Sequence, residues 1–353
     1  MLPTPISARF SQRSPKLGGG ITASTAYHRH GRSRARLDVL LTRARVTNLG
    51  LILLGSFAAL SFLVNLSYYL SSSCAPGVVA FGHPPGSILD TIEREDEVKG
   101  LSHLILVPGH GIWKGWNEEE KLDEEKWVLE QYQLGGGRVS AWVKHIETGA
   151  ELALQDENSL LVFSGGQTRR NSTTTEGESY LRLASQTGMF KPNHRGISDL
   201  EPFRRATTEN YALDSFQNLL FAIARFHEYT GRYPELITVV GYEMKRKRFT
   251  DLHRAALRWP ADRFHYIGID PEKEAPSARN GERQNGYLPY TRDTYGCHDE
   301  LQQKRRSRNP FFRYHSYYTS SPDLTGLFDW CPGTPEGGPT VLYPGQLPWH
   351  KPR

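Results

Sequence analysis

A short apolar run that ends in glycine occurs twice, and it constrains the fold more than any other feature of the chain. Leu104–Val107 leads into Pro108-Gly109-His110-Gly111, and Leu160–Phe163 leads into Ser164-Gly165-Gly166. Uninterrupted apolar runs of this kind are typical of strands buried on both faces of a parallel sheet. Because ligands bind beyond the carboxyl ends of such strands, the two glycine turns mark the expected crevice.

Further strands and helices alternate along the chain after this point. Leu236–Val240 and Phe264–Ile269 predict two more strands. Helices are expected over Glu118–Tyr132, over Val139–Ile146, from about Glu176, along the stripe Leu213–Ile223, and over Lys247–Arg258. This alternation predicts an α/β fold, a Rossmann-like three-layer sandwich with a mostly parallel sheet, over residues 101–295. Residues 296–353 lack periodicity and are rich in Pro, Gly and aromatic residues, so we expect a tail packed on the domain.

One segment near the amino terminus is suited to a membrane. Thr47–Leu70 contains no charged residue and is apolar on all sides, with Tyr68 and Tyr69 at one end. About 20 apolar residues are enough to cross a bilayer, and aromatic residues favour its interface. Residues 47–70 are therefore predicted to be a transmembrane signal anchor, and residues 71–100 a linker to the α/β domain.

The charges on either side of this segment predict its orientation. Residues 1–46 carry many Arg residues against the single acid Asp38, and their composition predicts a disordered basic tail. Ser71–Ile92 holds no Lys or Arg. The positive-inside rule then places the amino terminus in the cytosol and the domain in the lumen of the endoplasmic reticulum or Golgi. A mitochondrial membrane is the alternative, because import signals share this composition.

The interpretation of two cysteines and one asparagine depends on this membrane topology. Cys297 and Cys331 either pair in an oxidising lumen or remain as two separate thiols. Asn171-Ser172-Thr173 is a glycosylation acceptor sequence in a polar segment. A domain behind a membrane is not expected to bind nucleic acid. The basic runs Lys245–Arg248 and Lys304–Arg306 are interpreted first as solvated surface, with binding of an anionic lipid or substrate as the alternative.

Several motifs together resemble the DUF218 family, whose bacterial members include envelope proteins of the vancomycin-exclusion type. The matching segments lie between about Leu101 and Asp270: Val107–Gly111, Val162–Gly166, Thr175–Gly177, Glu209–Asn218 and Thr238–Arg246. The long tail looks like that of fungal members. The resemblance implies a Rossmann-like fold with a polar pocket, and it implies no agreed reaction.

The chain departs from the family pattern at three positions. Glu243 stands where the family usually has a histidine before Arg246, which puts any role for an imidazole there in doubt. Ala212 and Asp214 stand where bacterial relatives tend to carry Ser and Asn.

The glycine turns are the candidate ligand-binding elements. Their backbone N–H groups, beside a helix amino terminus, are suited to a phosphate or carboxylate. The alternative is that the glycines only permit tight turns. The predicted ligand-binding residues are Gly109, Gly111, Ser164, Gly165, Gly166, Ser215, Glu243 and Arg246.

Four polar residues are the candidates for chemistry. Glu176, Asp214 and Asn218 are expected to point into the crevice and to position a Mg²⁺ ion, a water or an acceptor hydroxyl. The alternatives are a solvated helix face for Asp214 and Asn218, and helix capping for Glu176. His110 is the candidate acid or base, because imidazole titrates near neutral pH.

These observations lead to two hypotheses. The first is a single-pass membrane protein whose domain binds a phosphorylated or nucleotide-like small molecule, as a hydrolase or transferase acting on envelope or glycoconjugate precursors. The second is a non-catalytic ligand-binding or scaffold module of the endomembrane system. The chain has no Gly-x-Gly-x-x-Gly, Walker, His-Glu-x-x-His, Cys-x-x-Cys or Gly-x-Ser-x-Gly sequence, which argues against dehydrogenase, P-loop, zinc protease and esterase classes.

Overall fold

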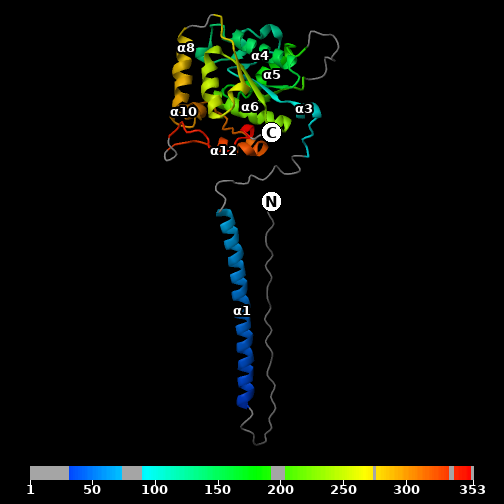
Figure 1. The fold of residues 1–353 in the computed structure, drawn as a ribbon, viewed down its shortest axis with the longest axis vertical. Helices are drawn as coiled ribbons and strands as arrows, with labels where there is room; N and C mark the ends of the chain where they lie inside the picture. Colours follow the sequence, from blue (N-terminus) through cyan, green and yellow to red (C-terminus); the bar gives the residue numbers. More distant parts are fainter. Residues whose placement is uncertain (1–31, 74–89, 192–202, 273–275, 334–337, 351–353) are drawn as a thin grey trace, which may run out of the picture. The chain divides into compact units, whose positions relative to one another are not determined.

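The computed structural model describes residues 32–73, 90–191, 203–272, 276–333 and 338–350 (Figure 1). The chain divides into two units, residues 1–79 and 80–353, and each is described here by itself. Residues 1–31 of the predicted basic tail and residues 74–89 of the predicted linker lie outside the described residues.

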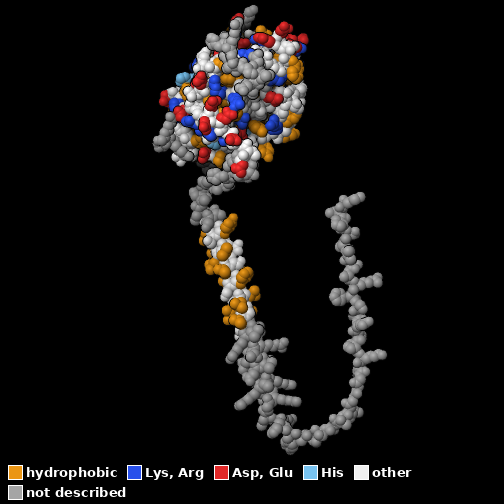
Figure 2. Space-filling view, turned by 90° about the vertical axis from the view of Figure 1, so that its right-hand side faces the viewer, with side chains coloured by type: hydrophobic (Ala, Val, Ile, Leu, Met, Phe, Trp, Pro, Cys, Tyr) orange, Lys and Arg blue, Asp and Glu red, His pale blue; other side chains and the backbone are white. Residues whose placement is uncertain are grey.

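The first unit holds one long helix, α1 (Arg32–Ser73). Its segment Asn48–Leu70 has a mean hydropathy of 2.1, and none of it is buried by the rest of the protein. Figure 2 shows its apolar side chains open to the surroundings. By length and composition this helix can cross a membrane. The helix also includes residues 32–46, where we expected disorder, because a helix once nucleated extends readily through Arg, Ala and Leu.

The second unit is built on a five-stranded, all-parallel sheet of order β5-β4-β1-β6-β7. Four of its strands were predicted: β1 (His103–Pro108), β4 (Ser159–Ser164), β6 (Leu236–Gly241) and β7 (Phe264–Gly268). The edge strand β5 (Ala206–Glu209) was missed, because its sequence Ala-Thr-Thr-Glu has no apolar run to reveal it. The predicted α/β class with a mostly parallel sheet is confirmed.

Helices cover both faces of this sheet, which makes three layers (Figure 1). One core holds Ile105 and Val107 of β1 under α4 (Arg138–Gln155) and α5 (Glu176–Gln186). The other core holds Leu104 and Leu106 under α6 (Ser215–Thr230). Successive side chains of a strand point to opposite faces, so a continuous apolar run is what a strand between two helical layers requires.

The segment between β1 and α4 differs from the prediction. Instead of a helix over Glu118–Tyr132, it forms a short antiparallel pair, β2 (Ile112–Trp113) and β3 (Trp127–Val128), with three 3-10 turns, η1 (Glu118–Glu120), η2 (Glu124–Lys126) and η3 (Gln131–Gln133). The Trp127 ring packs against Trp142 and Tyr180, at 5.6 and 6.0 Å between ring centroids. Burial of these aromatic rings outweighs the weak helical periodicity of the acidic residues around them.

The chain after β6 forms a short 3-10 turn, η4 (Glu243–Lys245), and one continuous helical stretch made of the π-helix η5 (Arg248–His253) and α7 (Arg254–Ala256). After η6 (Ala261–Arg263) and β7, α8 (Pro276–Glu282), η7 (Arg283–Tyr287) and α9 (Leu288–Arg292) follow. The tail holds α10 (Asp299–Ser307), α11 (Tyr317–Ser320), η8 (Pro322–Leu324), α12 (Thr325–Phe328) and η9 (Pro348–His350). Tyr317, Leu324, Leu327 and Trp349 of the tail join the core on the α6 side of the sheet.

Gly177, in the first turn of α5, provides a test of this packing. A Cβ atom there would lie 2.5 Å from the Phe163 carbonyl oxygen and 2.9 Å from that of Glu209, and neither backbone atom can turn aside. Gly177→Ala should therefore lower the free energy of unfolding by about 1–3 kcal/mol. Urea unfolding of the full chain in detergent, followed by near-UV circular dichroism, measures this loss.

Gly281→Ala is the matched control, because a Cβ atom at Gly281 in α8 meets nothing within 4 Å. This substitution should be neutral or slightly stabilising, since alanine loses less backbone entropy on folding than glycine. Equal midpoints for the two variants would contradict the close approach of α5 to the sheet.

Candidate functional site

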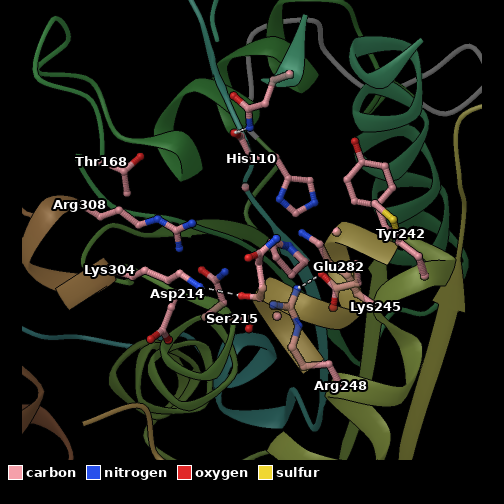
Figure 3. A pocket seen from close by; sticks show the side chains of 18 of the residues that line it. His110, Thr168, Asp214, Ser215, Tyr242, Lys245, Arg248, Glu282, Lys304 and Arg308 are labelled. Carbon is pink, nitrogen blue, oxygen red and sulfur yellow. Dashed lines mark hydrogen bonds and ion pairs between the residues drawn. The ribbon is translucent and has the colours of Figure 1, made fainter. Parts of the chain in front are cut away.

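A cavity of about 620 Å³ opens beyond the carboxyl ends of β1 and β6 (Figure 3). From β1 the chain proceeds to β4 and β5 on one side of the sheet, and later to β6 and β7 on the other. The cavity thus lies at the point where the strand order reverses, which is where open parallel sheets bind ligands. Its walls include Gly109, His110, Thr168, Arg169, Glu176, Asp214, Ser215, Asn218, Tyr242, Lys245, Arg248, Glu282, Lys304 and Arg308.

The glycine turns do not form the predicted anion cradle. The N–H of Gly109 donates to the Ser164 carbonyl at 2.7 Å, that of Gly165 to Glu209 at 3.0 Å, and that of Gly166 to Ala212 at 2.8 Å. These amides are occupied within the protein. Of the five predicted residues of these turns, only Gly109 lines the cavity; Gly111, Ser164, Gly165 and Gly166 do not.

Close packing explains the glycines instead. A Cβ atom on Gly109 or Gly165 would lie 2.5 or 2.8 Å from the Cβ of Glu176, and one on Gly111 would lie 2.8 Å from the Trp142 ring. Glycine at these positions allows α5 and α4 to approach the strand ends. The alternative interpretation of the turns, as steric features, fits these contacts.

Glu176 is the first residue of α5 and faces the cavity while bonded within the protein. Its carboxylate accepts a hydrogen bond from the Thr168 hydroxyl and lies 3.6 Å from the Arg169 guanidinium. The cap of the helix is Thr175, whose hydroxyl accepts from the Glu178 N–H at 3.0 Å. Glu176 is thus a paired carboxylate in the wall rather than the cap.

Asp214 is the amino-terminal cap of α6 and also forms an ion pair. One carboxylate oxygen accepts from the Gln217 N–H at 2.9 Å, and the other lies 2.6 Å from Nε of Arg305 in α10. Burial opposes ionisation of this carboxyl, but Arg305 and the Gln217 amide outweigh it and hold the pKa of Asp214 below its ordinary value. Helix α6 and the tail are joined at this contact.

Asn218 belongs to a buried network that includes a residue we did not predict, Glu209. The Ser164 hydroxyl donates to Glu209 at 2.6 Å and lies 2.9 Å from the Asn218 side-chain oxygen. Burial raises the pKa of Glu209 to about 7, although Ser164 and nearby backbone N–H groups favour the charged form. Glu209 ends the missed strand β5, and only its place in a matching motif singled it out in the sequence.

Ser215 and His110 line the cavity: Ser215 has a hydrogen-bond partner, whereas the His110 ring is stacked and its Nε2 has no hydrogen-bond partner among the described residues. The Ser215 hydroxyl lies 2.8 Å from Nε2 of the fully buried His253. The His110 ring stacks on Tyr242, with 5.0 Å between centroids and 11° between planes. Burial, and then Lys245, hold the pKa of His110 well below its ordinary value, so its imidazole is neutral at physiological pH.

Glu243 and Arg246 lie outside the cavity, contrary to the prediction. Arg246 donates to the two carboxylate oxygens of Glu243 at 2.7 and 2.6 Å, and both side chains are partly exposed to solvent. Residues of the same turn occupy the site in their place, namely Tyr242 and Lys245. The 3-10 turn η4 rotates Glu243 and Arg246 away from the cavity.

Cationic side chains dominate the walls, and none of them was among the predicted site residues. Six basic residues line the cavity against three acidic ones: Arg138, Arg169, Lys245, Arg248, Lys304 and Arg308 against Glu176, Asp214 and Glu282. The basic runs Lys245–Arg248 and Lys304–Arg306 were interpreted first as solvated surface, with binding of an anionic lipid or substrate as the alternative. Their only signal in the sequence was the spacing of Lys245 and Arg248, and of Lys304 and Arg308, by about one helical turn.

Lys245 is the cation least compensated by the protein. Among the described residues no carboxylate pairs with it, and its Nζ lies 5.1 Å from the centroid of the Tyr242 ring. Burial and then the Arg248 guanidinium lower the pKa of Lys245 to about 7. Arg248 differs, because its Nη2 lies 3.1 Å from Glu282. An anion that enters the cavity is attracted to the Lys245 ammonium without having to displace a carboxylate.

A divalent cation does not fit this set of residues. Each acidic side chain of the wall is paired with an arginine: Glu176 with Arg169, Asp214 with Arg305 and Glu282 with Arg248. Mg²⁺ requires oxygen ligands with negative charge to spare, and the surplus in the described walls is positive. The expected Mg²⁺ site is not supported by these residues.

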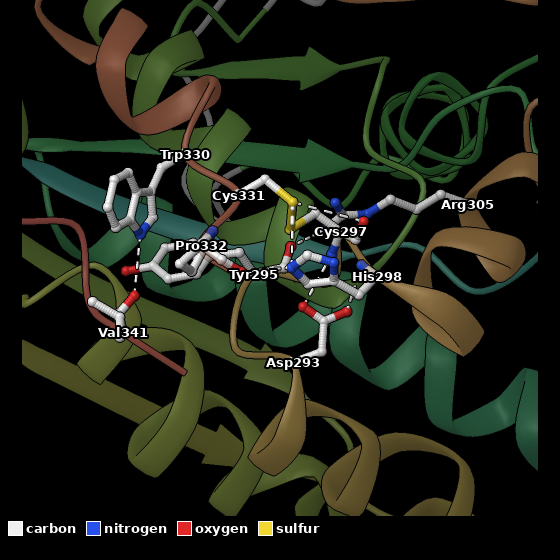
Figure 4. The surroundings of a disulfide bond; sticks show 9 residues. All are labelled: Asp293, Tyr295, Cys297, His298, Arg305, Trp330, Cys331, Pro332 and Val341. Atoms are coloured by element: carbon white, nitrogen blue, oxygen red, sulfur yellow. Dashed lines mark hydrogen bonds between the residues drawn. A yellow bond between two sulfur atoms is a disulfide. The ribbon is translucent and has the colours of Figure 1, made fainter. Parts of the chain in front are cut away.

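The tail brings two cations to the cavity, Lys304 on α10 and Arg308 directly after it, and a disulfide lies just before this helix (Figure 4). Cys297 and Cys331 are bonded, with 5.9 Å between their Cα atoms. Asp293 accepts hydrogen bonds from the N–H groups of Cys297 and His298 at 3.2 and 2.9 Å. Of the two alternatives for the thiols, the structure has the paired one.

The fold and site define a doubly wound α/β domain with a cationic pocket at its switch point, in a chain with one candidate membrane helix. The chain is 30% identical over 259 residues to the uncharacterized protein YOR238W of Saccharomyces cerevisiae. The aligned region covers 61% of this chain and 86% of the yeast protein. The chain belongs to the same family as YOR238W. No protein-family model matches it, and no solved structure does.

The Asp214–Arg305 pair generates a prediction about stability and pH. Asp214→Asn keeps a capping side chain but leaves Arg305 without its partner, at a cost of about 3 kcal/mol, the low end for buried pairs. Because the pKa of Asp214 is lowered in the folded protein, this contribution is complete above the ordinary carboxyl pKa of about 3.9. The gap in unfolding free energy between parent and variant should thus be full at pH 7 and 5.5 and shrink below about pH 4.

Asp251→Asn is the matched control. Asp251 is an exposed aspartate on η5 whose carboxylate accepts from the Thr250 hydroxyl beside it at 2.7 Å. This substitution should leave the midpoint of urea unfolding nearly unchanged at every pH. A gap for Asp214→Asn that persists unaltered at pH 3 would show that the ion pair does not carry the effect.

Proposed function

We propose that this is a single-pass membrane protein whose α/β domain binds a phosphorylated or nucleotide-like small molecule in the cavity at the switch point. The observation that carries the proposal is the excess of basic side chains in the walls, with Lys245 unpaired by any described carboxylate. Arginine guanidinium groups bind phosphate oxygens in pairs, and lysine supplies a point charge.

The size and the other walls of the cavity support a ligand larger than a simple anion. A volume of about 620 Å³ lies within the usual range for small-molecule sites. Tyr132, Trp142 and Tyr242 also line it and offer aromatic surface beside the cations. A phosphate group near Lys245 with an attached ring or sugar on the aromatic side suits this arrangement.

Within this proposal, binding is better supported than hydrolysis or group transfer. Glu176 and Asp214 are each paired with an arginine, and Asn218 is bonded to Ser164. A general acid or base must be able to exchange a proton with the ligand, and these contacts occupy three of the four candidates; only His110, whose Nε2 has no hydrogen-bond partner among the described residues, is left. We therefore place the non-catalytic ligand-binding module first, and the hydrolase or transferase of envelope and glycoconjugate precursors second.

The proposal includes a lumenal location in the endoplasmic reticulum or Golgi and a relationship to the DUF218 family and its fungal members. The Cys297–Cys331 disulfide supports the lumen, because cytosolic thiols are kept reduced. The charge difference across α1 supports the same orientation. The glycine turns and the parallel sheet match what the DUF218 resemblance implies.

Ligand binding is tested with inorganic pyrophosphate and uridine diphosphate, each titrated against the full chain in detergent by calorimetry. The parent should bind both, and uridine should not bind. Lys245→Met and Lys304→Gln should each weaken binding about tenfold, since each removes one charge-assisted hydrogen bond to the anion. Arg306→Gln is the control: Arg306 lies on α10, is exposed, and does not line the cavity.

Inorganic sulfate, which does not titrate near neutral pH, tests the role of Lys245 directly. The ammonium of Lys245 is charged below about pH 7 and neutral above it. Sulfate affinity of the parent should therefore fall about tenfold between pH 6 and 8.5. Lys245→Arg should remove this fall, because arginine stays charged. A parent that binds no anion at either pH would refute the proposed function.

The lumenal location is tested at Asn171, which is exposed in the loop between β4 and α5. The full chain, produced in a eukaryotic cell, should carry a glycan there, seen as a mass shift that a glycosidase removes and Asn171→Gln abolishes. Asn158→Gln is the control, because Asn158 is exposed but lies in no acceptor sequence. A chain with an unmodified Asn171 would indicate the mitochondrial or cytosolic side.

A further inference from the structure

A short loop after α10 exposes three aromatic side chains to solvent. Phe312 is 89% exposed, Tyr314 is 87% exposed and Phe311 is 36% exposed. Burying a Phe side chain stabilises a protein, so a loop that leaves these rings outside forgoes that gain. We call residues Asn309–Tyr314 the aromatic loop. Among the described residues of the domain, its neighbouring positions 312 and 314 carry the most exposed large apolar side chains.

The aromatic loop is held in a defined conformation. The Asn309 side chain donates to the Arg313 carbonyl at 2.7 Å and accepts from the Arg313 N–H at 2.9 Å. Phe312 has a φ of 54°, in the left-handed region that is unfavourable for a bulky residue. The hydrogen bonds of Asn309 thus fix a strained backbone that turns the Phe312 ring outward.

The base of the loop is attached firmly to the domain. The Arg313 guanidinium lies 4.7 Å from the centroid of the Tyr211 ring. His315 packs against Phe221 of α6, with 4.5 Å between centroids, and Tyr317 is buried beside it. The exposed rings therefore project from a rigid surface.

The segment of sequence that contains the loop carries only positive charges. No Asp or Glu occurs between Leu301 and Pro322, whereas Arg306, Arg308 and Arg313 flank the aromatic residues. Arg306 is exposed. Exposed aromatic rings among arginines are the composition of surfaces that lie at the interface of a bilayer, with rings among the headgroups and guanidinium groups on lipid phosphates.

The apolar helix α1 and the short segment after it keep a bilayer within reach of this surface. Helix α1 is long and apolar enough to cross a membrane. Residues 74–89 connect it to the first described residue of the domain, Asp90, and a chain of that length spans at most about 55 Å. The effective concentration of lipid around a domain tethered in this way is high, so even a few apolar contacts favour docking.

We propose that the aromatic loop Asn309–Tyr314 docks the domain on the surface of the bilayer that α1 spans, with Phe311, Phe312 and Tyr314 among the lipid headgroups. Arg306 and Arg313 contact lipid phosphates beside them. Arg308, which lines the ligand cavity, precedes the loop directly, so docking brings the α10 wall of the cavity next to the membrane surface.

The test measures contact with lipid in the full chain reconstituted in phosphatidylcholine vesicles. Two proteins are made in a Cys74→Ser background, one with Phe312→Cys and one with Glu157→Cys. Each is labelled at its new cysteine with the same environment-sensitive fluorophore. Glu157 is exposed and precedes Asn158, whose carbonyl accepts a hydrogen bond from the Ser102 N–H at 2.9 Å. Because Ser102 lies just before β1, the first strand of the domain, a fluorophore at position 157 reports on the edge of the domain where the chain enters it. Lipids with a shallow spin label quench any fluorophore that enters the headgroup region.

Docking predicts a blue-shifted emission and strong quenching at position 312, with neither at position 157. Equal quenching at both positions, or stronger quenching at 157, would mean that the tether alone brings the domain near lipid, and this would overturn the proposal. A blue shift at 312 without lipid quenching would assign the loop to a second copy or another protein, and it would overturn the proposal as well.

A second pair of variants keeps the test independent of folding. Tyr314→Asp, added to the labelled Phe312→Cys protein, should reduce the quenching at least twofold and leave the melting temperature unchanged, because Tyr314 is almost fully exposed. Thr319→Asp, at an exposed position of α11 outside the loop, should alter neither quantity. Unchanged quenching in the Tyr314→Asp protein would show that the aromatic side chains do not hold the domain on the bilayer.

Discussion

The burial of β1 on both faces is the constraint on which the rest of the domain depends. Leu104 and Leu106 enter one core, and Ile105 and Val107 enter the other, all without exposure to solvent. A strand buried on both faces needs a covering layer on each face, and the helices of the two cores provide these layers. Strand β1 lies between β4 and β6, at the reversal of strand order where the cavity opens.

A second contact, between distant parts of the chain, completes the cavity. Asp214 caps α6 and holds Arg305 of α10, so the same carboxylate organises the helix and seats the tail. Once α10 is seated, Lys304 and Arg308 face the cavity together with Lys245 and Arg248. The carboxylate that looked like a catalytic candidate is better understood as the anchor that assembles a cationic wall.

Sequence reasoning was accurate for the buried strands and poor for the site. Four strands were predicted because apolar runs report burial locally, whereas β5 was missed because an edge strand with Thr and Glu carries no such run. Glu243 and Arg246 were predicted as ligand residues, yet they pair with each other on the surface. Lys245, Arg248 and Lys304 belong to basic runs that were assigned first to solvated surface, yet they line the cavity, because little in the local sequence distinguishes a buried charged side chain from an exposed one.

The sequence by itself determined the parallel sheet, the helices on both its faces and the apolar helix α1, because each follows from the spacing of apolar residues over a few positions. The tertiary structure alone decided which polar groups are available to a ligand. Whether a charge is free depends on partners far away in the chain, as with Asp214 and Arg305, which are 91 residues apart. Only folding brings such residues together, and it is this pairing that neutralises the carboxylates and leaves Lys245 for an anion.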